Sequence, residues 1–536
     1  MSKKDTVYLL HTFKNKIGLR TFLIQYLPLV ATRMSPLLIV ILTLLVVYKL
    51  YRFVYDKPPN TPPGLIRIPI GGSYWLLLWR NYKYVHLALD YYAKKLKSKL
   101  FSCYFGDYFV VIANDYANIK EIFSREEFDG RVTSADYIKD RAFKKELGIF
   151  FIEGPQWQEQ RRFALRHMRD FGFGRRQDTL ESEVMDEMTL FIDILKNEPI
   201  YDEEKKIIKG NLALFPDILY ASAANNIWTI MFGYRFNRSE HDILRHLCRS
   251  ALMMQRANDP SGGALFQRPI LKHFGNMFGY KNHITGSNAM IDVVKKALER
   301  QKATLSENVN RGFVDIYLKK LNEDDKSPYF TEEQLIILLI DMMFPAYSAV
   351  PTAITHAIKY LMHHPEIMNK VQNEIDSVVG TGRLVTWADR INLPYTEAAI
   401  RESLRIETLA PLGIIHKTMK KTTLGGYNIP ANTPVIANLA AMNNDPDMWG
   451  DPENFRPERF LKEDGQLSKD LTLTFGFGHR LCAGETFARF NMFETIALLL
   501  QTFNFSFVDG EPSSLDDKVP GLIISPKELW LRLELR

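Results

Sequence analysis

Apolar residues recur at helical spacing along most of the chain. This spacing predicts helices at 85–96, 119–127, 157–171, 182–196, 216–232, 290–301, 332–363, 365–379, 388–405 and 483–503. Short β-like runs at 101–114, 422–439 and 521–535 predict strands, and Gly425 and Gly426 mark a hairpin turn in the second run. The pattern therefore predicts a mainly α fold with a small β subdomain.

The expected helix at 332–363 contains two prolines within the stretch MMFPAYSAVPT, residues 342–352. A proline inside a helix costs about 3 kcal/mol, because it removes a backbone donor and its ring collides with the preceding turn. Thr331 is the expected N-cap of this helix, and Pro365 is expected to stop it. We expect the two internal prolines to bend the helix, since kinks occur mostly at proline.

An apolar run near the N-terminus predicts a membrane anchor. It begins as PLLIVILTLLVV and is long enough, at about 20 residues, to span a bilayer. No small-residue cleavage site follows it, so a cleaved signal peptide is not favoured. The predicted organisation is a basic extension at 1–33, a transmembrane anchor at 34–55, a proline-rich linker at 56–72 and one large domain at 73–536. Basic residues just after the anchor favour a cytosolic large domain.

Residues 1–33 are rich in lysine and arginine, and Asp5 is their only acidic residue. This composition resembles an organelle-import leader. The alternative is that translation starts at Met34, and both interpretations stay open.

Composition narrows the class of protein only modestly. The net charge of +6 suits an anionic membrane or an acidic partner, and no nucleic-acid motif occurs, so nucleic-acid binding is not expected. Three cysteines without a CxxC pair cannot form a disulfide framework or a zinc site of the usual pattern. The large domain is therefore expected to fold in a reducing compartment.

The stretch FGFGHRLCAG, residues 475–484, has the features of a thiolate site. Its glycines allow a flat ligand to approach the backbone, and Arg480 could neutralise an anionic group on that ligand. A helix is expected to begin after Cys482, and its N-terminal amides would favour a thiolate. The loop suits a metal with one cysteine ligand, and a structural cysteine in a glycine-rich turn is the alternative.

This stretch resembles the haem-binding signature FxxGxRxCxG of the cytochrome P-450 family. Its fixed positions are filled by Phe475, Gly478, Arg480, Cys482 and Gly484. The resemblance implies haem b with Cys482 as the axial thiolate to iron, a ligand that favours O–O cleavage.

Further motifs extend the resemblance over nearly the whole chain. ESLR matches the family's ExxR through Glu402 and Arg405, and PERF supplies Arg459, which in the family joins that pair and braces the core beneath the haem. WQEQR matches WxxxR, which implies that Trp157 and Arg161 bind a haem propionate.

Two more residues are implied to contact the propionates. They are Arg131 in FDGRV and His416 in GIIHKT. For both, an ordinary surface position is the alternative.

The central helix departs from the family pattern. The family carries (A/G)Gx(D/E)TT there, and the acid and the first threonine organise water and deliver protons during oxygen activation. On the spacing to ExxR, Ala346 takes the glycine position, Ser348 replaces the acid and Ala349 replaces the alcohol. The proton-relay pair is therefore absent from these distal positions.

Three functions follow from this departure. The first is a monooxygenase for an apolar substrate (a steroid, fatty acid, juvenoid or xenobiotic), in which Ser348, Tyr347, water or a substrate hydroxyl supplies protons. The second is a haem-thiolate isomerase or dehydratase acting on a pre-oxygenated substrate. The third is a non-catalytic haem or ligand-binding protein.

In detail, the amino-acid sequence resembles those of animal microsomal members of the family, especially arthropod ones, near the clan of vertebrate drug and steroid hydroxylases. That likeness implies an endoplasmic reticulum membrane location, with the mitochondrion as the alternative. It also implies electrons from NADPH through NADPH-cytochrome P-450 reductase, with cytochrome b5 as a further partner. Lys144, Lys145 and Arg162 are candidates for the reductase dock, and a solvated helix face is the alternative.

Overall fold

The computed structural model describes residues 36–133, 136–173, 178–256, 269–274 and 277–536. The predicted N-terminal extension at 1–33 lies outside these residues. Contacts divide the chain into a small unit that ends at Pro58 and includes Ile66–Ile68, and a large unit made of Pro59–Leu65 and Pro69–Arg536.

The small unit contains α3 (Pro36–Tyr55), a helix of 20 residues with no buried side chain. Within the described residues, only α3 and the central helix of the large unit are long and apolar enough to cross a membrane. The apolar window of the central helix is 89% buried, whereas that of α3 is 0% buried. The apolar helix α3 is therefore the candidate anchor, and its length matches about 20 spanning residues.

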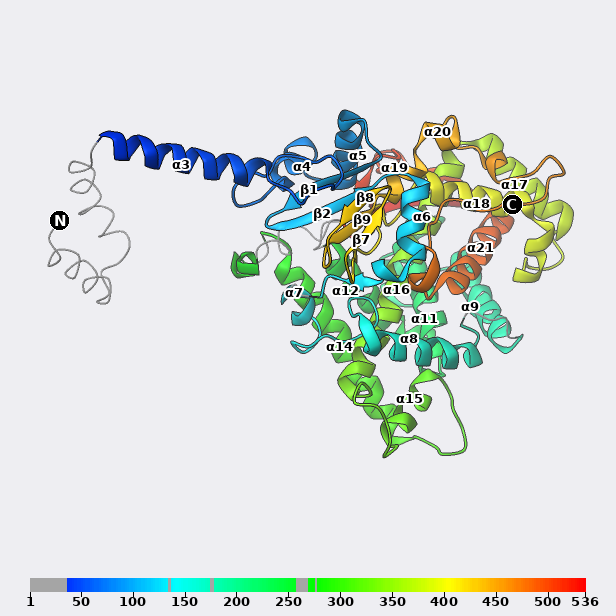
Figure 1. Cartoon of the computed structure of the whole chain (residues 1–536). Coiled ribbons are helices and arrows are strands. Elements are labelled where there is room, and N and C mark those ends of the chain that lie inside the picture. Colours follow the sequence, from blue (N-terminus) through cyan, green and yellow to red (C-terminus); the bar gives the residue numbers. More distant parts are fainter. Residues whose placement is uncertain (1–35, 134–135, 174–177, 257–268, 275–276) are drawn as a thin grey trace. The chain divides into compact units, whose positions relative to one another are not determined.

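The large unit is mainly helical (Figure 1). Its helices are α4 (Tyr74–Arg80), α5 (Val85–Leu96), α6 (Tyr116–Ser124), α7 (Asp136–Asp140), α8 (Gly154–Met168), α9 (Asp178–Lys196), α10 (Asp202–Lys205), α11 (Tyr220–Phe232), α12 (His241–Arg256), α14 (Tyr280–Ala303), α15 (Phe313–Leu321), α16 (Glu332–His363), α17 (Pro365–Val378), α18 (Pro394–Ile406), α19 (Leu439–Asn443), α20 (Pro446–Trp449) and α21 (Glu485–Thr502). The helix expected from 388 begins instead at Pro394, because proline suits the first turn and a short 3-10 helix precedes it.

Four small sheets complete the described fold. Their strands are β1 (Leu100–Phe105), β2 (Tyr108–Ala113), β3 (Gly130–Arg131), β4 (Ile208–Lys209), β5 (Leu212–Phe215), β6 (His416–Lys417), β7 (Thr422–Leu424), β8 (Tyr427–Ile429), β9 (Pro434–Ala437), β10 (Phe503–Phe507), β11 (Lys518–Val519), β12 (Ser525–Pro526) and β13 (Leu529–Leu535). The orders are β1-β2-β9-β6-β3, β10-β13-β5-β4, β11-β12 and β7-β8. The pairing of β2 with β9 is parallel, and the other pairs are antiparallel.

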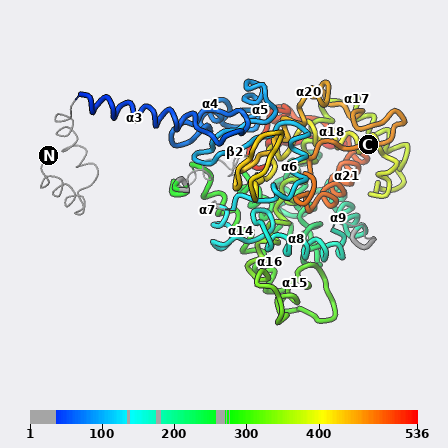
Figure 2. Tube along the Cα trace, in the orientation of Figure 1, coloured from blue at the N-terminus to red at the C-terminus, as the bar shows by residue number. Residues whose placement is uncertain are grey.

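These sheets confirm the expected fold class, a mainly α chain with little β structure. Helices α4 and α5 pack against β1, and α17, α18 and α21 gather near the C-terminus (Figures 1 and 2). The β7–β8 hairpin turns at Gly425 and Gly426, whose φ angles of 54° and 82° favour glycine.

Part of the proline-rich segment lies along β1 instead of hanging free. The N–H of Ser102 donates to the carbonyl of Pro63 at 2.8 Å, and the N–H of Leu65 donates to the carbonyl of Ser102 at 3.0 Å. These bonds extend the edge of the five-stranded sheet, so residues from Pro59 to Leu65 belong to the large unit.

The central helix α16 runs for 32 residues through both prolines without interruption. Its expected cap is confirmed, because the Thr331 side chain accepts the N–H of Gln334 at 3.1 Å. Helices α11, α12, α14, α18 and α21 pack against it. Each proline removes one intrahelical bond, and burial of the surrounding side chains outweighs that loss.

The buried side chains of α16 belong to two different hydrophobic clusters. Residues up to Tyr347 pack in one cluster with α11, α12 and α14, whereas residues from Val350 onward pack in a second cluster with α17, α18 and α21. The two clusters meet at Ser348 and Ala349, where the family's proton-relay pair was expected.

Candidate active site

The loop before α21 holds Cys482 through its backbone. The Cys482 N–H donates to the carbonyl of Phe475 at 2.8 Å. Gly478 has a φ of +67°, and a Cβ there would lie 2.1 Å from the carbonyl oxygen of Phe123 in α6. Only glycine fits such a position, so this glycine sets the path of the loop. Gly484 has no such constraint, since a Cβ there would make only an ordinary contact at 3.6 Å.

Cys482 is the accessible thiol among the three cysteines. Cys103 in β1 and Cys248 in α12 are buried, whereas Cys482 is exposed. Burial raises the pKa of Cys248 well above its usual value. Desolvation by the surrounding chain also raises the pKa of Cys482, and the Gly484 backbone and the charge of Arg161 oppose that rise. The charge of Glu485 adds to that rise in pKa, so a bound metal ion would have to supply the positive charge that favours the Cys482 thiolate.

A cluster of arginines lies beside this loop. The guanidinium of Arg480 stacks 3.6 Å from the ring centroid of Trp157 in α8, and that of Arg161 lies 5.9 Å from the same ring. Arg480 donates to the carbonyls of Asp129 and Ile152, and its Nε lies 2.9 Å from the Asp129 carbonyl oxygen. The WQEQR motif of α8 and the Cys482 loop, which lie far apart in the chain, are therefore in contact.

The carboxylates of Asp129 and Glu153 act on this cluster, but burial outweighs their effect on the pKa values of Arg480 and Arg131. Burial, and then the charge of Arg131, lower the pKa of Arg480 to about 8, and burial lowers the pKa of Arg131 to about 10. Arginine stays protonated in proteins, so these shifts reflect buried cations in need of an anion. The Nε of Arg131 and the indole N–H of Trp157 have no hydrogen-bond partner in the described structure. The site therefore fits a group that carries carboxylates.

Arg131 and His416 are buried, so the alternative that they occupy ordinary surface positions is wrong. They face one another across β3 and β6 and are only 5% and 4% exposed. Burial and the charge of Arg131 lower the pKa of His416 well below its usual value, so the ring is neutral. Its Nδ1 lies 2.7 Å from the carbonyl oxygen of Phe128, which fixes the proton on Nδ1. The other ring nitrogen is then an acceptor.

Glu402, Arg405 and Arg459 form one buried network. Arg405 donates through Nε and Nη2 to the two carboxylate oxygens of Glu402, at 2.7 and 2.8 Å. Arg459 adds a bond from its Nε at 3.2 Å. Both partners of the first pair are 0% exposed. Arg405 also donates to the carbonyls of Asn443 and Pro452, so the network ties α18 to the chain before Cys482.

The accessible face of α16 is apolar. Between residues 342 and 352, only Pro345 and Ala349 are partly exposed. They lie four residues apart and therefore on one side of the helix. Ala346 is 6% exposed and Ser348 is fully buried. The Ser348 hydroxyl donates to the carbonyl of Phe344 at 2.9 Å, so its proton is held within its own helix.

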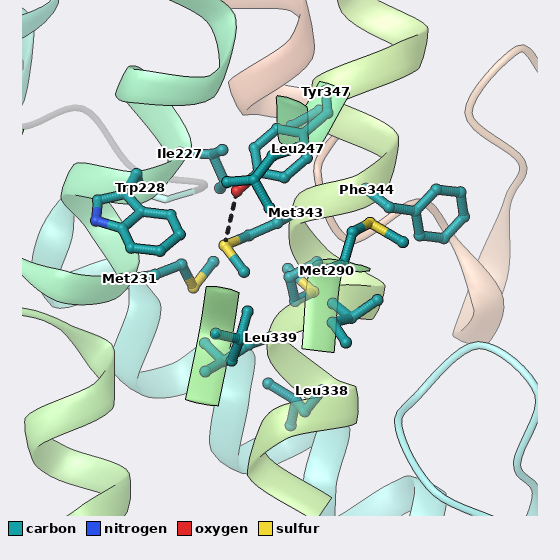
Figure 3. Close-up of a cluster of buried hydrophobic side chains, with 14 of the residues drawn as sticks. Ile227, Trp228, Met231, Leu247, Met290, Leu338, Leu339, Met343, Phe344 and Tyr347 are labelled. Atoms are coloured by element: carbon teal, nitrogen blue, oxygen red, sulfur yellow. Dashed lines mark hydrogen bonds between the residues drawn. The ribbon is translucent and has the colours of Figure 1, made fainter. Parts of the chain in front are cut away.

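Tyr347 lies in the core, away from the face of Pro345 and Ala349. Figure 3 shows it pointing toward Ile227 and Leu247, with its hydroxyl donating to the sulfur of Met343 at 3.1 Å. Burial raises its pKa well above the usual value. Tyr347 therefore points away from the face of Pro345 and Ala349, since neighbours two positions away on a helix face opposite sides.

The sequence reasoning missed a buried ion pair near the start of this face. Asp341 of α16 accepts the Nη1 of Arg141 at 2.8 Å and the backbone N–H groups of Ile149 and Phe150 at 2.8 and 3.0 Å. The signal was present, because Asp341 is a lone acid within an otherwise apolar run.

The candidate docking residues differ in their partners. Lys144 pairs with Asp140 and Lys145 pairs with Glu333. Arg162 is exposed on α8, next to Arg161, whose side chain donates to the Leu481 carbonyl. Of the three, Arg162 is the one whose neighbour contacts the Cys482 loop.

Comparison with known proteins agrees with this arrangement. The family model described as cytochrome P450 matches residues 62–532. Farnesoate epoxidase of Bombyx mori is 30% identical over 487 residues, which cover 89% of this chain and 94% of that protein. Cytochrome P450 2J3 of Rattus norvegicus is 31% identical over 484 residues, covering 88% and 91%. Cytochrome P450 2J2 of Homo sapiens is 31% identical over 486 residues, covering 88% and 90%. The chain thus belongs to the cytochrome P450 family.

Proposed function

We propose that this protein is a membrane-anchored haem-thiolate monooxygenase that inserts one oxygen atom from dioxygen into an apolar substrate. The observation that carries the proposal is the accessible thiol of Cys482 beside the buried Arg131 and the partly buried Arg161 and Arg480, three arginines whose pKa values are lowered by burial. Membership of the family implies a haem iron held by a thiolate and electrons supplied by a reductase.

Different residues around the Cys482 loop would bind different parts of haem b. Cys482 would bind the iron, and Arg131, Arg161, Arg480 and Trp157 would bind the propionates. When bound, the haem supplies oxygen activation at its iron, and the thiolate donates electron density that favours O–O cleavage. Charge-assisted bonds to a carboxylate are roughly twice as strong as neutral ones, which suits the three arginines.

His416 has a more limited role in this proposal. Its Nδ1 proton is engaged by the Phe128 carbonyl, and the neutral ring has no second N–H. We therefore assign it to positioning Phe128 and the β3–β6 pair, and leave propionate binding to the arginines and Trp157.

The proton supply would use backbone and water instead of an acid–alcohol pair. Pro345 has no N–H, so the carbonyl of Asp341 lacks the donor that a helix normally places four residues later. Pro351 has the same effect on the carbonyl of Tyr347. A water molecule held at the Asp341 carbonyl, beside the face of Pro345 and Ala349, would donate protons that Ala349 cannot.

The substrate would be apolar. Phe344, which directly precedes Pro345 on α16, packs edge to face against Phe150 with ring centroids 5.5 Å apart. Steroids, fatty acids, juvenoids and xenobiotics share the required character. The name of the Bombyx mori relative describes an epoxidase of farnesoate, which supports acyclic isoprenoids as the first substrates to test.

Location and partners follow from the anchor and the family. Helix α3 would hold the protein in the endoplasmic reticulum membrane, with the catalytic domain on the cytosolic side. NADPH-cytochrome P450 reductase would supply electrons, with cytochrome b5 as a further donor. Arg162 on the exposed side of α8 would contact the acidic reductase.

The test is reconstitution of the haem-loaded full chain with reductase and farnesoic acid. We expect the red-shifted band of the reduced carbon-monoxide complex, and oxygenated product that depends on NADPH. Turnover of hydroperoxides without NADPH would instead indicate an isomerase or dehydratase. Binding spectra without any turnover would indicate a non-catalytic ligand-binding protein.

A further inference from the structure

A small surface pocket lies between the C-terminal part of α5 and the corner where α19 passes into α20. Helix α19 packs against α5 (Figure 1). The pocket has a volume of about 280 Å³, and neither α16 nor the Cys482 loop contributes a residue to it. Sites for small molecules typically occupy about 300–1,000 Å³, so this pocket suits a small ligand.

Part of the pocket lining is apolar and has short side chains. Ala93 of α5, Ala441 of α19 and Pro446 of α20 contribute to it. Side chains of this size leave room for a flat ring to lie against them. Apolar lining with a few placed polar groups is the usual character of a site for a small molecule.

Two lysines of the lining are held in place by carboxylates. The Nζ of Lys94 lies 2.6 Å from Asp90, one turn earlier on α5. The Nζ of Lys99 lies 2.7 Å from Asp445 and 3.2 Å from Asp447. A lysine has three N–H donors, of which Lys94 uses one and Lys99 two in these bonds. Both ammonium groups therefore keep a donor for a further acceptor.

A third lysine of the lining, Lys97, forms no ion pair among the described residues. It directly follows α5 and is exposed. Its backbone has a φ of 52°, and its N–H donates to the carbonyl of Lys94 at 3.1 Å. The chain therefore leaves the helix at Lys97, and the ammonium of this residue has all three of its donors left for a ligand.

The lining thus combines spare cationic donors with a short apolar surface. A phosphate group matches the donors, because its oxygens accept several charge-assisted hydrogen bonds at once. A ring joined to that phosphate would lie against Ala93, Ala441 and Pro446. A metal cation does not suit the pocket, since three ammonium groups would repel it.

We propose that this pocket binds a phosphate monoester carried on a small ring, with Lys94, Lys97 and Lys99 around the phosphate. Soluble ring phosphates and the headgroups of phosphorylated inositol lipids share this chemistry. Binding here requires neither haem reduction nor turnover, so it is independent of the proposed function.

The first experiment is calorimetric titration of the full-length, haem-loaded protein with phenyl phosphate and with inorganic phosphate. Ionic strength is held constant, because salt screens exposed charges. We expect phenyl phosphate to bind at least about fivefold more tightly, since its ring adds apolar contact. Absence of phenyl phosphate binding would overturn the proposal, and equal affinities for the two probes would overturn the assignment of a ring.

Lys97→Gln is the decisive variant and should weaken phenyl phosphate binding by at least about fivefold, because it removes the unpaired charge. Lys95→Gln is the matched control, since Lys95 is exposed on the same helix but does not line the pocket. This control should keep the affinity. Equal losses in the two variants would indicate attraction to a basic surface in general and would overturn the proposal, as would full affinity in Lys97→Gln.

Ala441→Leu tests the apolar side of the pocket without changing charge. The larger side chain would take the space of the ring, so the preference for phenyl phosphate over inorganic phosphate should fall close to one. A preference that survives this change would contradict the placement of the ring. An unchanged haem spectrum in all three variants is the check that each is folded.

The source of the ester is decided with the protein in phosphatidylcholine nanodiscs, with or without a phosphatidylinositol monophosphate. A lipid headgroup in the pocket would compete with phenyl phosphate and weaken its binding in the second set, and Lys97→Gln would remove that difference. Equal affinity in both sets would assign the pocket to a soluble ester. A competition by the lipid that persists in Lys97→Gln would contradict binding at this pocket.

Discussion

The two sides of the candidate active site use charge in opposite ways. Around the Cys482 loop, buried charges are concentrated and tied together, as in the pair of Glu402 with Arg405. Along the accessible face of α16, Pro345 and Ala349 present no ionisable group. The loop side carries the residues that the family resemblance implies, whereas Ser348 and Ala349 stand on the helix side at the positions where the resemblance implies a relay pair. The difference indicates that holding the cofactor and delivering protons are separable tasks in this fold.

Replacing Cys482 tests the loop side with the largest expected effect. Cys482→Ala should abolish the red-shifted band of the reduced carbon-monoxide complex, because no other accessible thiol lies in the described structure. Cys248→Ala is the matched control and should keep the band, since Cys248 is buried in α12. A band that survives Cys482→Ala would show that the ligand is wrongly assigned.

Glu402→Gln tests whether the paired charges carry stability. The change leaves the buried cations of Arg405 and Arg459 without their carboxylate, and losing one partner of a buried pair costs about 3–5 kcal/mol. Urea unfolding of the haem-loaded protein measures the loss. Asp202→Asn breaks the exposed pair with Lys205 and should cost less than about 1 kcal/mol. Equal losses in the two variants would contradict the contrast between buried and exposed charge.

Restoring the relay pair tests the helix side. Ser348→Asp combined with Ala349→Thr should raise the product formed per NADPH by about tenfold, because positioned acids and alcohols contribute at least that much to proton transfer. The measurement is the ratio of product to NADPH consumed with saturating reductase. An unchanged ratio would mean that protons reach the site by a route that does not involve these positions.

Ser348→Ala should have the smallest effect. The Ser348 hydroxyl is buried and already donates to the Phe344 carbonyl, so its removal should change the product-to-NADPH ratio by less than about twofold. A large drop would assign the proton supply to Ser348 and remove the need for a backbone-held water.

The sequence was most informative where chemistry depends on residue spacing. The Cys482 loop, the Glu402–Arg405 pair and the Thr331 cap could all be read from local patterns, because each depends on neighbours a few residues apart. The contact between Trp157 and Arg480 could be inferred only through the family resemblance, because Arg480 follows Trp157 by 323 positions in the chain. The course of α16 and the orientation of its side chains depend on tertiary packing.

Two features show why packing could not be predicted. The prolines of α16 predicted a bend, which the continuity of the helix does not test. The sequence could not supply the burial against α11, α12, α14, α17, α18 and α21 that keeps the run helical through both prolines. Tyr347 was a plausible proton donor by sequence position, but only the structure reveals that it faces Leu247 and the sulfur of Met343. Asp341 was visible as a lone acid, and its partner Arg141 lies 200 positions earlier in the chain.

The most direct test of the account is turnover with isotope-labelled dioxygen. The haem-loaded full chain, with reductase, NADPH and farnesoic acid, should give a product that carries one labelled oxygen atom, formed in proportion to the NADPH consumed. This result would show that dioxygen is activated without an acid–alcohol pair at Ser348 and Ala349. An unlabelled product, or one formed equally well without NADPH, would contradict the assignment as a monooxygenase.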